Sequence, residues 1–247
     1  MTVPVRVRWL RLPDAGLSDV ERDRLALDVD AATLGRVRRM RRPLDRDRRL
    51  AGHALLRRMA AAVSGTAPSA LVVAVRCVTC GSTDHGKPYL ALPGAPEVNL
   101  AHSGRVVAVV LAPAGTPVGI DVESRTDADW PALRRAVFTD LEWSWTADQP
   151  DPERARLTAW ARKEAVVKAT GHGLAIPLNR VRVDGAAPWT PTLTDPAMIE
   201  PSRIMVGTDL TSAPDHAMAV AAVVPAGAKL EVDVAEVTHP AKTPLLE

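Results

Sequence analysis

Long apolar runs are missing from this sequence of 247 residues. It has no stretch of about 18 consecutive apolar residues, which excludes a hydrophobic helix that spans a membrane. Residues 1–12 alternate valine with arginine and lack the apolar centre of a secretory signal peptide. We therefore expect a protein of the cytoplasm that does not bind membranes.

Cysteine is also scarce, because Cys77 and Cys80 are the only two. A structural zinc site usually takes four ligands from two such pairs, and this chain has one pair, followed by His85. The pattern favours a reduced thiol pair in a loop. A partial metal site with His85 as a third ligand, or a redox pair, is the alternative.

Charge is nearly balanced over the chain but is unevenly distributed. The formal net charge is +2, whereas residues 1–60 hold 15 arginines against 8 acids. Taken alone, the arginine cluster from Arg36 to Arg49 is typical of a solvated helix face and, less often, of a nucleic-acid patch. The apolar content of 47% suits one large domain or two of roughly 120 residues.

Hydrophobic periodicity predicts a mixed α+β chain. Helices are expected over residues 19–27, 30–40, 46–62, 131–138, 139–145 and 153–170. Strands are expected over residues 3–12, 72–77, 98–101, 106–112, 118–123, 181–183, 203–206 and 217–224, with a loop over 81–88. Residues 112–117 are rich in turn formers and indicate a junction, and the tail after Val234 is expected to fray. Both sides of the junction show a strand, helices and several strands, which predicts two similar α+β halves packed side by side.

Acids and lysines are concentrated in two of these elements. Asp121 and Glu123 are two apart in a predicted strand and should face the same side, while the helix over 153–170 places Lys163, Glu164 and Lys168 within about one turn of one another. Carboxylates of this kind bind a hard cation such as Mg²⁺, and lysines neutralise phosphate charge. The predicted chemistry is that of a metal-bound pyrophosphate.

Five motifs occur in a fixed order between residues 86 and 174. They are Gly-Lys-Pro at 86–88, Asn-Leu-Ala-His-Ser-Gly at 99–104, Gly-Ile-Asp-Val-Glu at 119–123, Phe138 with Glu142, and Trp-x-x-Lys-Glu-Ala-x-x-Lys-Ala-x-Gly-x-Gly-Leu at 160–174. Together they resemble the 4′-phosphopantetheinyl transferase superfamily, and more closely its surfactin-synthetase-activating type. Each motif alone is weak, but their common order makes chance a poor explanation.

The resemblance implies a fold and a domain organisation. The expected fold is α+β, with two similar α/β subdomains packed side by side in one chain and related by pseudo-two-fold symmetry. Residues 1–113 would form an N-terminal half that contacts the nucleotide of coenzyme A. Residues 117–247 would form a C-terminal half with the metal and catalytic residues, and the active site would lie at the junction of the halves. A monomer is expected, because both halves belong to one chain.

The resemblance also implies an activity. Members transfer the 4′-phosphopantetheine arm of coenzyme A to a serine of an apo carrier protein and release adenosine 3′,5′-bisphosphate. By resemblance, Asp121, Glu123 and Glu164 hold Mg²⁺, with Mn²⁺ as an alternative ion. Glu164 is also the candidate base for the serine proton, directly or through water, and Lys163 and Lys168 neutralise the pyrophosphate.

Four further residues are assigned to coenzyme A by the resemblance. His102 and Arg48 would bind its 3′-phosphate, Arg36 matches a basic position further upstream, and Lys87 would support the nucleotide. The expected protein partners are acyl or peptidyl carrier domains of polyketide, nonribosomal-peptide or fatty-acid biosynthesis. No nucleic-acid partner is expected.

Other classes of function fit parts of the sequence. A metal-dependent nuclease would also gather strand acids, but its acid-x-Lys pattern is absent, since Glu123 is followed by Ser124 and Arg125. A noncatalytic module that binds coenzyme A or a carrier would need a damaged metal site. A DNA-binding regulator built on the arginine-rich helices would bind DNA with a strong salt dependence.

Overall fold

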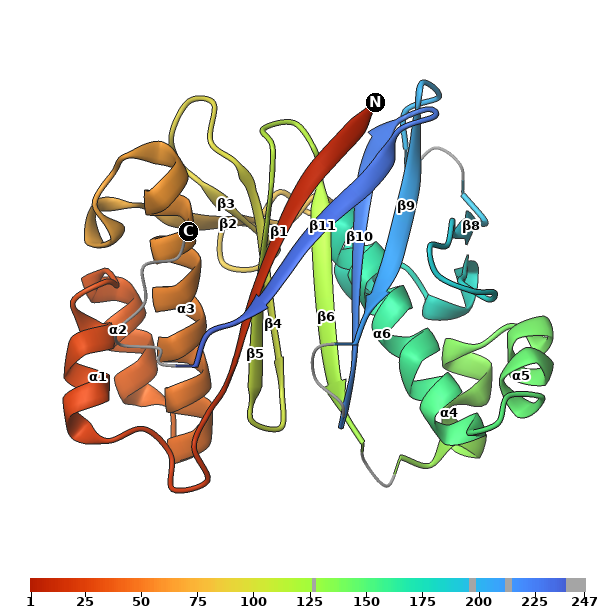
Figure 1. The fold of residues 1–247 in the computed structure, drawn as a ribbon, viewed down its shortest axis with the longest axis horizontal. Helices are drawn as coiled ribbons and strands as arrows, with labels where there is room; N and C mark the ends of the chain where they lie inside the picture. The colour runs from red at the N-terminus through yellow and green to blue at the C-terminus, as the bar shows by residue number, and fades with distance from the viewer. Residues whose placement is uncertain (126–127, 196–198, 212–214, 239–247) are drawn as a thin grey trace.

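The computed structural model describes residues 1–125, 128–195, 199–211 and 215–238, which form a mixed α+β fold as predicted (Figure 1). The strands are β1 (Thr2–Arg11), β2 (Val73–Arg76), β3 (Lys87–Leu90), β4 (Glu97–Ser103), β5 (Val106–Ala112), β6 (Val118–Ser124), β7 (Val181–Arg182), β8 (Thr192–Leu193), β9 (Arg203–Leu210), β10 (His216–Pro225) and β11 (Lys229–Glu236). The helices are α1 (Asp19–Ala26), α2 (Ala31–Arg39), α3 (Pro43–Ser64), α4 (Trp130–Val137), α5 (Asp140–Ala147) and α6 (Pro152–Thr170), with 3₁₀ turns η1 (Pro68–Ala70), η2 (Gly173–Ala175) and η3 (Leu178–Arg180).

Two main sheets organise the described residues. The first has the strand order β11-β1-β5-β4, and the second has the order β6-β10-β9. Strand β11 runs parallel to β1, whereas the other neighbours in both sheets are antiparallel. In the first sheet β1 pairs with β5, the second strand of the antiparallel pair β4 and β5. In the second sheet β6 pairs in the same way with β10, the second strand of the antiparallel pair β9 and β10. The strand orders β1-β5-β4 and β6-β10-β9 are therefore equivalent.

The two sheets lie between two groups of helices, α1 to α3 on one side and α4 to α6 on the other (Figure 1). Alternation along β5 shows how the layers form: Val106, Ala108 and Val110 belong to the core between the sheets, whereas Val107 and Val109 belong to the core beneath α3. A strand whose two faces are both buried is apolar throughout, as β5 is. The second sheet packs its outer face on α6 in the same way.

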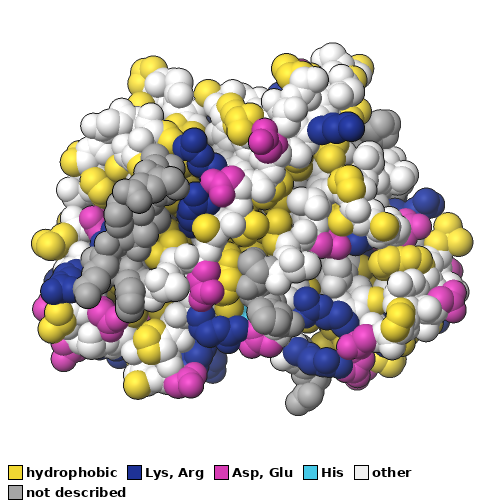
Figure 2. Space-filling view, in the orientation of Figure 1, with side chains coloured by type: hydrophobic (Ala, Val, Ile, Leu, Met, Phe, Trp, Pro, Cys, Tyr) yellow, Lys and Arg dark blue, Asp and Glu magenta, His cyan; other side chains and the backbone are white. Residues whose placement is uncertain are grey.

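Charged side chains of both signs cover the surface. Figure 2 shows acidic side chains among the basic ones on the visible face, so the arginine excess of the first 60 residues does not produce a continuous basic surface there. In the part of the chain that the structure describes, no helix combines the length and apolar character needed to cross a membrane.

Most predicted elements are confirmed, but three strands, β3, β8 and β11, were not predicted. β3 occupies part of the expected loop over 81–88, and β11 was not predicted although Leu230, Val232 and Val234 alternate along it. β11 also pairs with β1, so residues 229–236 join the N-terminal sheet although the expected boundary counts them with the C-terminal half. The tail was expected to fray after Val234, whereas β11 continues to Glu236; residues 239–247 lie outside the described residues.

Candidate active site

Strand β6 presents its two acids to helix α6. Val118, Ile120 and Val122 pack in the core between the sheets, so Asp121 and Glu123 lie on the opposite face of the strand. That face meets α6, because a carboxylate oxygen of Asp121 accepts a hydrogen bond from the α6 side chain Lys168. The prediction that the two acids share one face is confirmed.

The absence of a side chain at Gly119 allows α6 to approach β6 closely. A Cβ atom at this position would lie 2.2 Å from Ala165 O and 2.4 Å from Ala169 N, both in the helix backbone. This contact places the helical turn that carries Glu164 and Lys168 directly over the strand. The helix ends at Gly171, whose φ of +80° is a left-handed conformation that favours glycine.

Three carboxylates and one ammonium group meet at this contact. Lys168 Nζ lies 2.5 Å from Asp121 Oδ1, and Ser103 Oγ donates to Glu123 Oε2 at 2.8 Å. Burial raises the pKa of Asp121 to about 7; Lys168 acts against this shift, and the nearby charges of Glu123 and Glu164 add to it. Burial also raises the pKa of Glu164, with Lys168 opposing the shift and Glu123 adding to it. When ionised, the three carboxylates therefore carry more negative charge than the single ammonium group of Lys168 neutralises.

This arrangement fits a divalent cation. Asp121 is 3% exposed, and its second oxygen, Oδ2, is buried without a hydrogen-bond partner among the described residues. A buried carboxylate oxygen without a donor is costly unless a cation or a proton satisfies it. The ligand atoms of Asp121, Glu123 and Glu164 do not form a tight group within 4.8 Å, so an ion bound by all three would draw them closer together.

A second, basic group lies next to the acids. His102, on β4, is close enough for the charges of Arg48 and Lys168 to act on it. Its pKa is lowered mainly because the protein removes water from the imidazole, and next by the positive charge of Arg48. Arg48, on α3, donates to Gly104 O at 3.1 Å and forms an ion pair with Asp45. His102 therefore lies within range of the charges of Arg48 and Lys168, and the roles of the three residues toward coenzyme A stay predictions.

Two members of this basic group were not predicted. Arg49 and His53 lie on α3 one turn apart, and the charge of Arg36 on α2 lowers the pKa of both. Burial is the larger cause in each case, and it lowers the pKa of His53 to about 4. The spacing of four residues was a visible signal, because it places Arg49 and His53 on one helix face. Arg36 itself is exposed.

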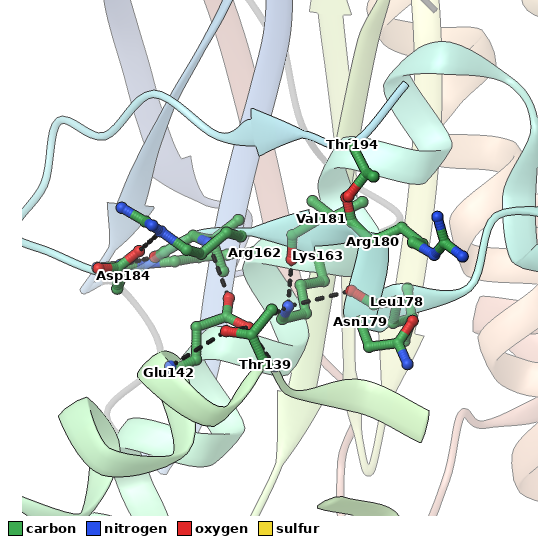
Figure 3. A network of polar contacts seen from close by, with 12 residues as sticks. Thr139, Glu142, Arg162, Lys163, Leu178, Asn179, Arg180, Val181, Asp184 and Thr194 are labelled. Atoms are coloured by element: carbon green, nitrogen blue, oxygen red, sulfur yellow. Dashed lines mark hydrogen bonds and ion pairs between the residues drawn. The ribbon is translucent and has the colours of Figure 1, made fainter. Parts of the chain in front are cut away.

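Lys163 does not reach this site, which corrects its assignment to the pyrophosphate. Its ammonium group is fully buried and donates to Glu142 Oε2 at 2.8 Å, to Leu178 O at 3.1 Å and to Val181 O (Figure 3). Glu142 is also fully buried, and it completes a capping box with Thr139 at the start of α5. The physical reason is helical geometry: Lys163 is five residues from Lys168, which turns it toward another face of α6.

Lys87 lies at the C-terminal end of α6, near Lys168. Its ammonium group is 3.1 Å from Glu97 Oε2 and donates to Ala169 O at 3.1 Å. Burial lowers the pKa of Lys87, and Glu97 opposes that shift. Lys87 also lines a cavity of about 560 Å³ together with Lys168, whereas the three site carboxylates do not line it. The contact of Lys87 with a nucleotide remains a prediction.

The fold and this site define a mixed α+β protein in which an acidic group on β6 and α6 lies beside a basic group on α3 and β4. Residues 117–221 match the family described as the 4′-phosphopantetheinyl transferase superfamily. The chain is 32% identical over 180 residues to a 4′-phosphopantetheinyl transferase of Bacillus subtilis, covering 70% of this chain and 75% of that protein. It is 30% identical over 187 residues to a phosphopantetheinyl transferase of Thraustochytrium sp., covering 69% of this chain and 62% of that protein.

A shorter match links the chain to 4′-phosphopantetheinyl transferase Sfp of Bacillus subtilis strain 168. The identity is 31% over 104 residues, which cover 40% of this chain and 44% of Sfp. The chain therefore belongs to the 4′-phosphopantetheinyl transferase superfamily, and the resemblance found in the ordered motifs is confirmed.

Proposed function

We propose that this enzyme transfers the 4′-phosphopantetheine arm of coenzyme A to a serine of an apo acyl or peptidyl carrier protein. The serine oxygen forms a bond to the phosphorus that carries the pantetheine arm, and the phosphoanhydride bond breaks to release adenosine 3′,5′-bisphosphate. The observation that carries the proposal is the meeting of Asp121, Glu123, Glu164 and Lys168 beside His102. A pyrophosphate between the two groups would meet a cation on one side and fixed positive charge on the other.

The acidic group has two tasks in this proposal. Asp121, Glu123 and Glu164 would hold Mg²⁺ or Mn²⁺, which when bound supplies positive charge to the pyrophosphate oxygens. Glu164 accepts the serine proton, directly or through a water molecule, and the burial that raises its pKa makes it a stronger base than an exposed carboxylate. Lys168 neutralises charge that develops on the leaving group. The Asp121 oxygen without a donor supports the cation, because it provides an unused ligand atom.

The basic group would hold the nucleotide. We assign the 3′-phosphate of coenzyme A to His102 and Arg48, with Arg49 and Arg36 adding positive charge around them. A guanidinium fork suits a phosphate dianion, and one charged hydrogen bond contributes about 1.5–3 kcal/mol. Arg48 can exchange part of its contact with Asp45 for a phosphate, because the Asp45 side chain is 31% exposed and water can solvate it in place of Arg48.

The arrangement of the strands supports an active site that is built from one chain. We propose that residues 1–113 and 117–247 are two halves related by pseudo-two-fold symmetry, with the active site at their junction. The shared strand order of β1-β5-β4 and β6-β10-β9 supports this arrangement, although β11 crosses to the first sheet. Since the basic group and the acidic group come from one chain, a monomer is sufficient. We propose the cytoplasm as its location.

The alternatives lose support from specific observations. A noncatalytic binder would not need three carboxylates beside Lys168, yet Asp121, Glu123 and Glu164 are all present. A DNA-binding regulator needs a broad basic surface, whereas acidic side chains interrupt the basic ones on the face in Figure 2. A gel-shift titration with salt tests the second alternative, because DNA binding of that kind weakens steeply as salt rises.

Chromatographic measurement of adenosine 3′,5′-bisphosphate tests the proposal. The protein, coenzyme A, Mg²⁺ and an apo carrier should release this product at a rate that Glu164→Gln lowers by about 10²–10³-fold, the range expected when a positioned catalytic group is removed. Lys229→Met changes an exposed lysine on β11 and should keep the full rate. Equal product release by the Glu164→Gln variant would contradict the assigned role.

A further inference from the structure

A compact group of metal-ligand side chains lies outside the carboxylate site. The loop between β2 and β3 brings Cys77, Cys80 and His85 together, with one ligand atom of each within 4.8 Å of the others. In residues 1–125, 128–195, 199–211 and 215–238, this is the only group of three or more His, Cys, Asp or Glu residues that meets this distance. Both cysteines are free, so no disulfide occupies their sulfur atoms.

The spacing of the ligand atoms matches tetrahedral zinc. Cys80 Sγ lies 3.5 Å from His85 Nε2. In a tetrahedral site, a Zn–S bond of about 2.3 Å and a Zn–N bond of about 2.0–2.1 Å separate sulfur and nitrogen by about 3.6 Å. The observed separation therefore allows one ion to contact both atoms with little movement.

The loop backbone holds these ligands in place. The Gly81 amide donates to Cys77 O at 2.9 Å, and the Cys77 amide donates to Ser82 O at 2.9 Å, which closes a tight turn around the cysteine pair. The chain thus builds the turn from its own hydrogen bonds.

Gly86 completes the loop where β3 begins. Its φ is +119°, and a Cβ atom there would lie 2.2 Å from Arg76 O, so only glycine permits this close return of the chain. His85 immediately precedes this glycine. The close return therefore brings the imidazole back beside the cysteine pair at the start of the same loop.

The three ligands open toward the 560 Å³ cavity, which His172 also lines. His172 Nδ1 is buried and has no hydrogen-bond partner among the described residues. The preceding residue, Gly171, packs on the cysteine loop, since a Cβ atom on it would lie 2.8 Å from Val78 Cγ2. A fourth ligand, from this imidazole or from water, can therefore be supplied on the cavity side.

We propose that Cys77, Cys80 and His85 bind one zinc ion, with the fourth coordination position facing the cavity. Two thiolates and an imidazole are soft donors that select zinc over Mg²⁺, so this site and the carboxylate site take different metals. The ion would fix the loop that packs on the end of α6 and leads into Lys87. Its role is structural: it supports the wall of the cavity that Lys87 and Lys168 also line.

Metal content of the full-length chain tests this proposal. The protein should be produced without a histidine tag in zinc-containing medium, passed over a chelating resin, and analysed by mass spectrometry of its metals. We expect about one zinc per chain, and loss to the background level in Cys80→Ser and in His85→Ala. Asp84→Asn alters an exposed carboxylate in the same loop that does not belong to the group, and it should retain the zinc.

A second measurement identifies the ligands in the unaltered chain. Replacement of zinc by Co²⁺ should give the visible absorption of a tetrahedral ion and a thiolate-to-cobalt band in the near ultraviolet. Wild-type protein without zinc and without that band would overturn the proposal, even if the variants fail to fold. Neither measurement depends on transferase activity, so failure of this proposal and failure of the proposed function are distinguishable.

Discussion

Replacement of Lys163 by methionine should destabilise the protein strongly while leaving the chemistry intact. Its ammonium group and the Glu142 carboxylate are both 0% exposed and 2.8 Å apart. Removal of one partner leaves a buried charge uncompensated, which costs about 3–5 kcal/mol. For a chain of this size, each kcal/mol lowers the melting temperature by about 2–4 °C, so the expected loss is about 6–20 °C.

Urea unfolding followed by tryptophan fluorescence measures this loss. The midpoint should fall while the dependence on urea keeps its slope, because the surface exposed on unfolding does not change. Lys229→Met is the matched control, since that lysine is exposed and its replacement should change the free energy of unfolding by less than about 0.5 kcal/mol.

Transfer rates then separate the two possible roles of Lys163. Measured at a temperature where the variant is folded, Lys163→Met should keep kcat within about threefold of the wild type, because the buried ammonium group does not contact the site. A loss of stability below about 1 kcal/mol together with a large loss of kcat would contradict the structural role of the buried Lys163 ammonium group. That pattern would restore Lys163 to the pyrophosphate.

Three other predictions follow from contacts of the site. Gly119→Ala should lower the free energy of unfolding by at least about 1–3 kcal/mol and lower the transfer rate, because the new methyl group meets Ala165 O. Gly35→Ala, at a helical position with space for a methyl group, is the control and should not destabilise the protein. The free energy of unfolding in urea should fall as the pH drops from about 6.5 to 4, because His53 binds a proton more readily in the unfolded chain than in the folded protein. His53→Gln should remove at most about 3 kcal/mol of this pH dependence. An unchanged pH profile in the variant would contradict the burial of His53. In calorimetry, Arg48→Ala should raise the Kd for coenzyme A by about 10- to 150-fold but change the Kd for 3′-dephospho-coenzyme A little. Equal losses of affinity for both ligands would contradict the contact of Arg48 with the 3′-phosphate.

The acidic centre was predictable from local periodicity. Asp121 and Glu123 share a strand face because side chains alternate, and Glu164 and Lys168 share a helix face because they are four residues apart. These short-range rules do not say how closely two elements approach. Gly119 supplies that approach, and its importance became visible only when Ala165 and Ala169 were placed against it.

Side-chain direction on α6 was the point at which sequence reasoning failed. Lys163 and Lys168 both fit a phosphate-binding role by residue type, but only the tertiary packing shows that Lys163 is buried against Glu142. The residue type alone does not distinguish a buried lysine paired with an acid from an exposed catalytic lysine. The distinction depends on α5 and on the turn before β7, which are far from Lys163 in the chain.

Long-range pairing was also beyond reach of the sequence patterns. The alternation over residues 229–236 predicts a strand if it is noticed, but nothing local says that the strand returns to pair with β1. The cysteine pair gives a similar lesson. One Cys-x-x-Cys is a weak signal for metal, and the structure strengthens it by folding His85 back beside Cys80.

Transfer of the phosphopantetheine arm can be read from the intact mass of apo carrier proteins incubated with this protein, coenzyme A and Mg²⁺. At least one carrier should gain the mass of one phosphopantetheine arm on its acceptor serine. A carrier with that serine replaced by alanine should gain nothing, and Asp121→Asn should abolish the gain while remaining folded. Unmodified carriers across fatty-acid, polyketide and nonribosomal-peptide types, with coenzyme A bound and the protein folded, would contradict the proposed transfer.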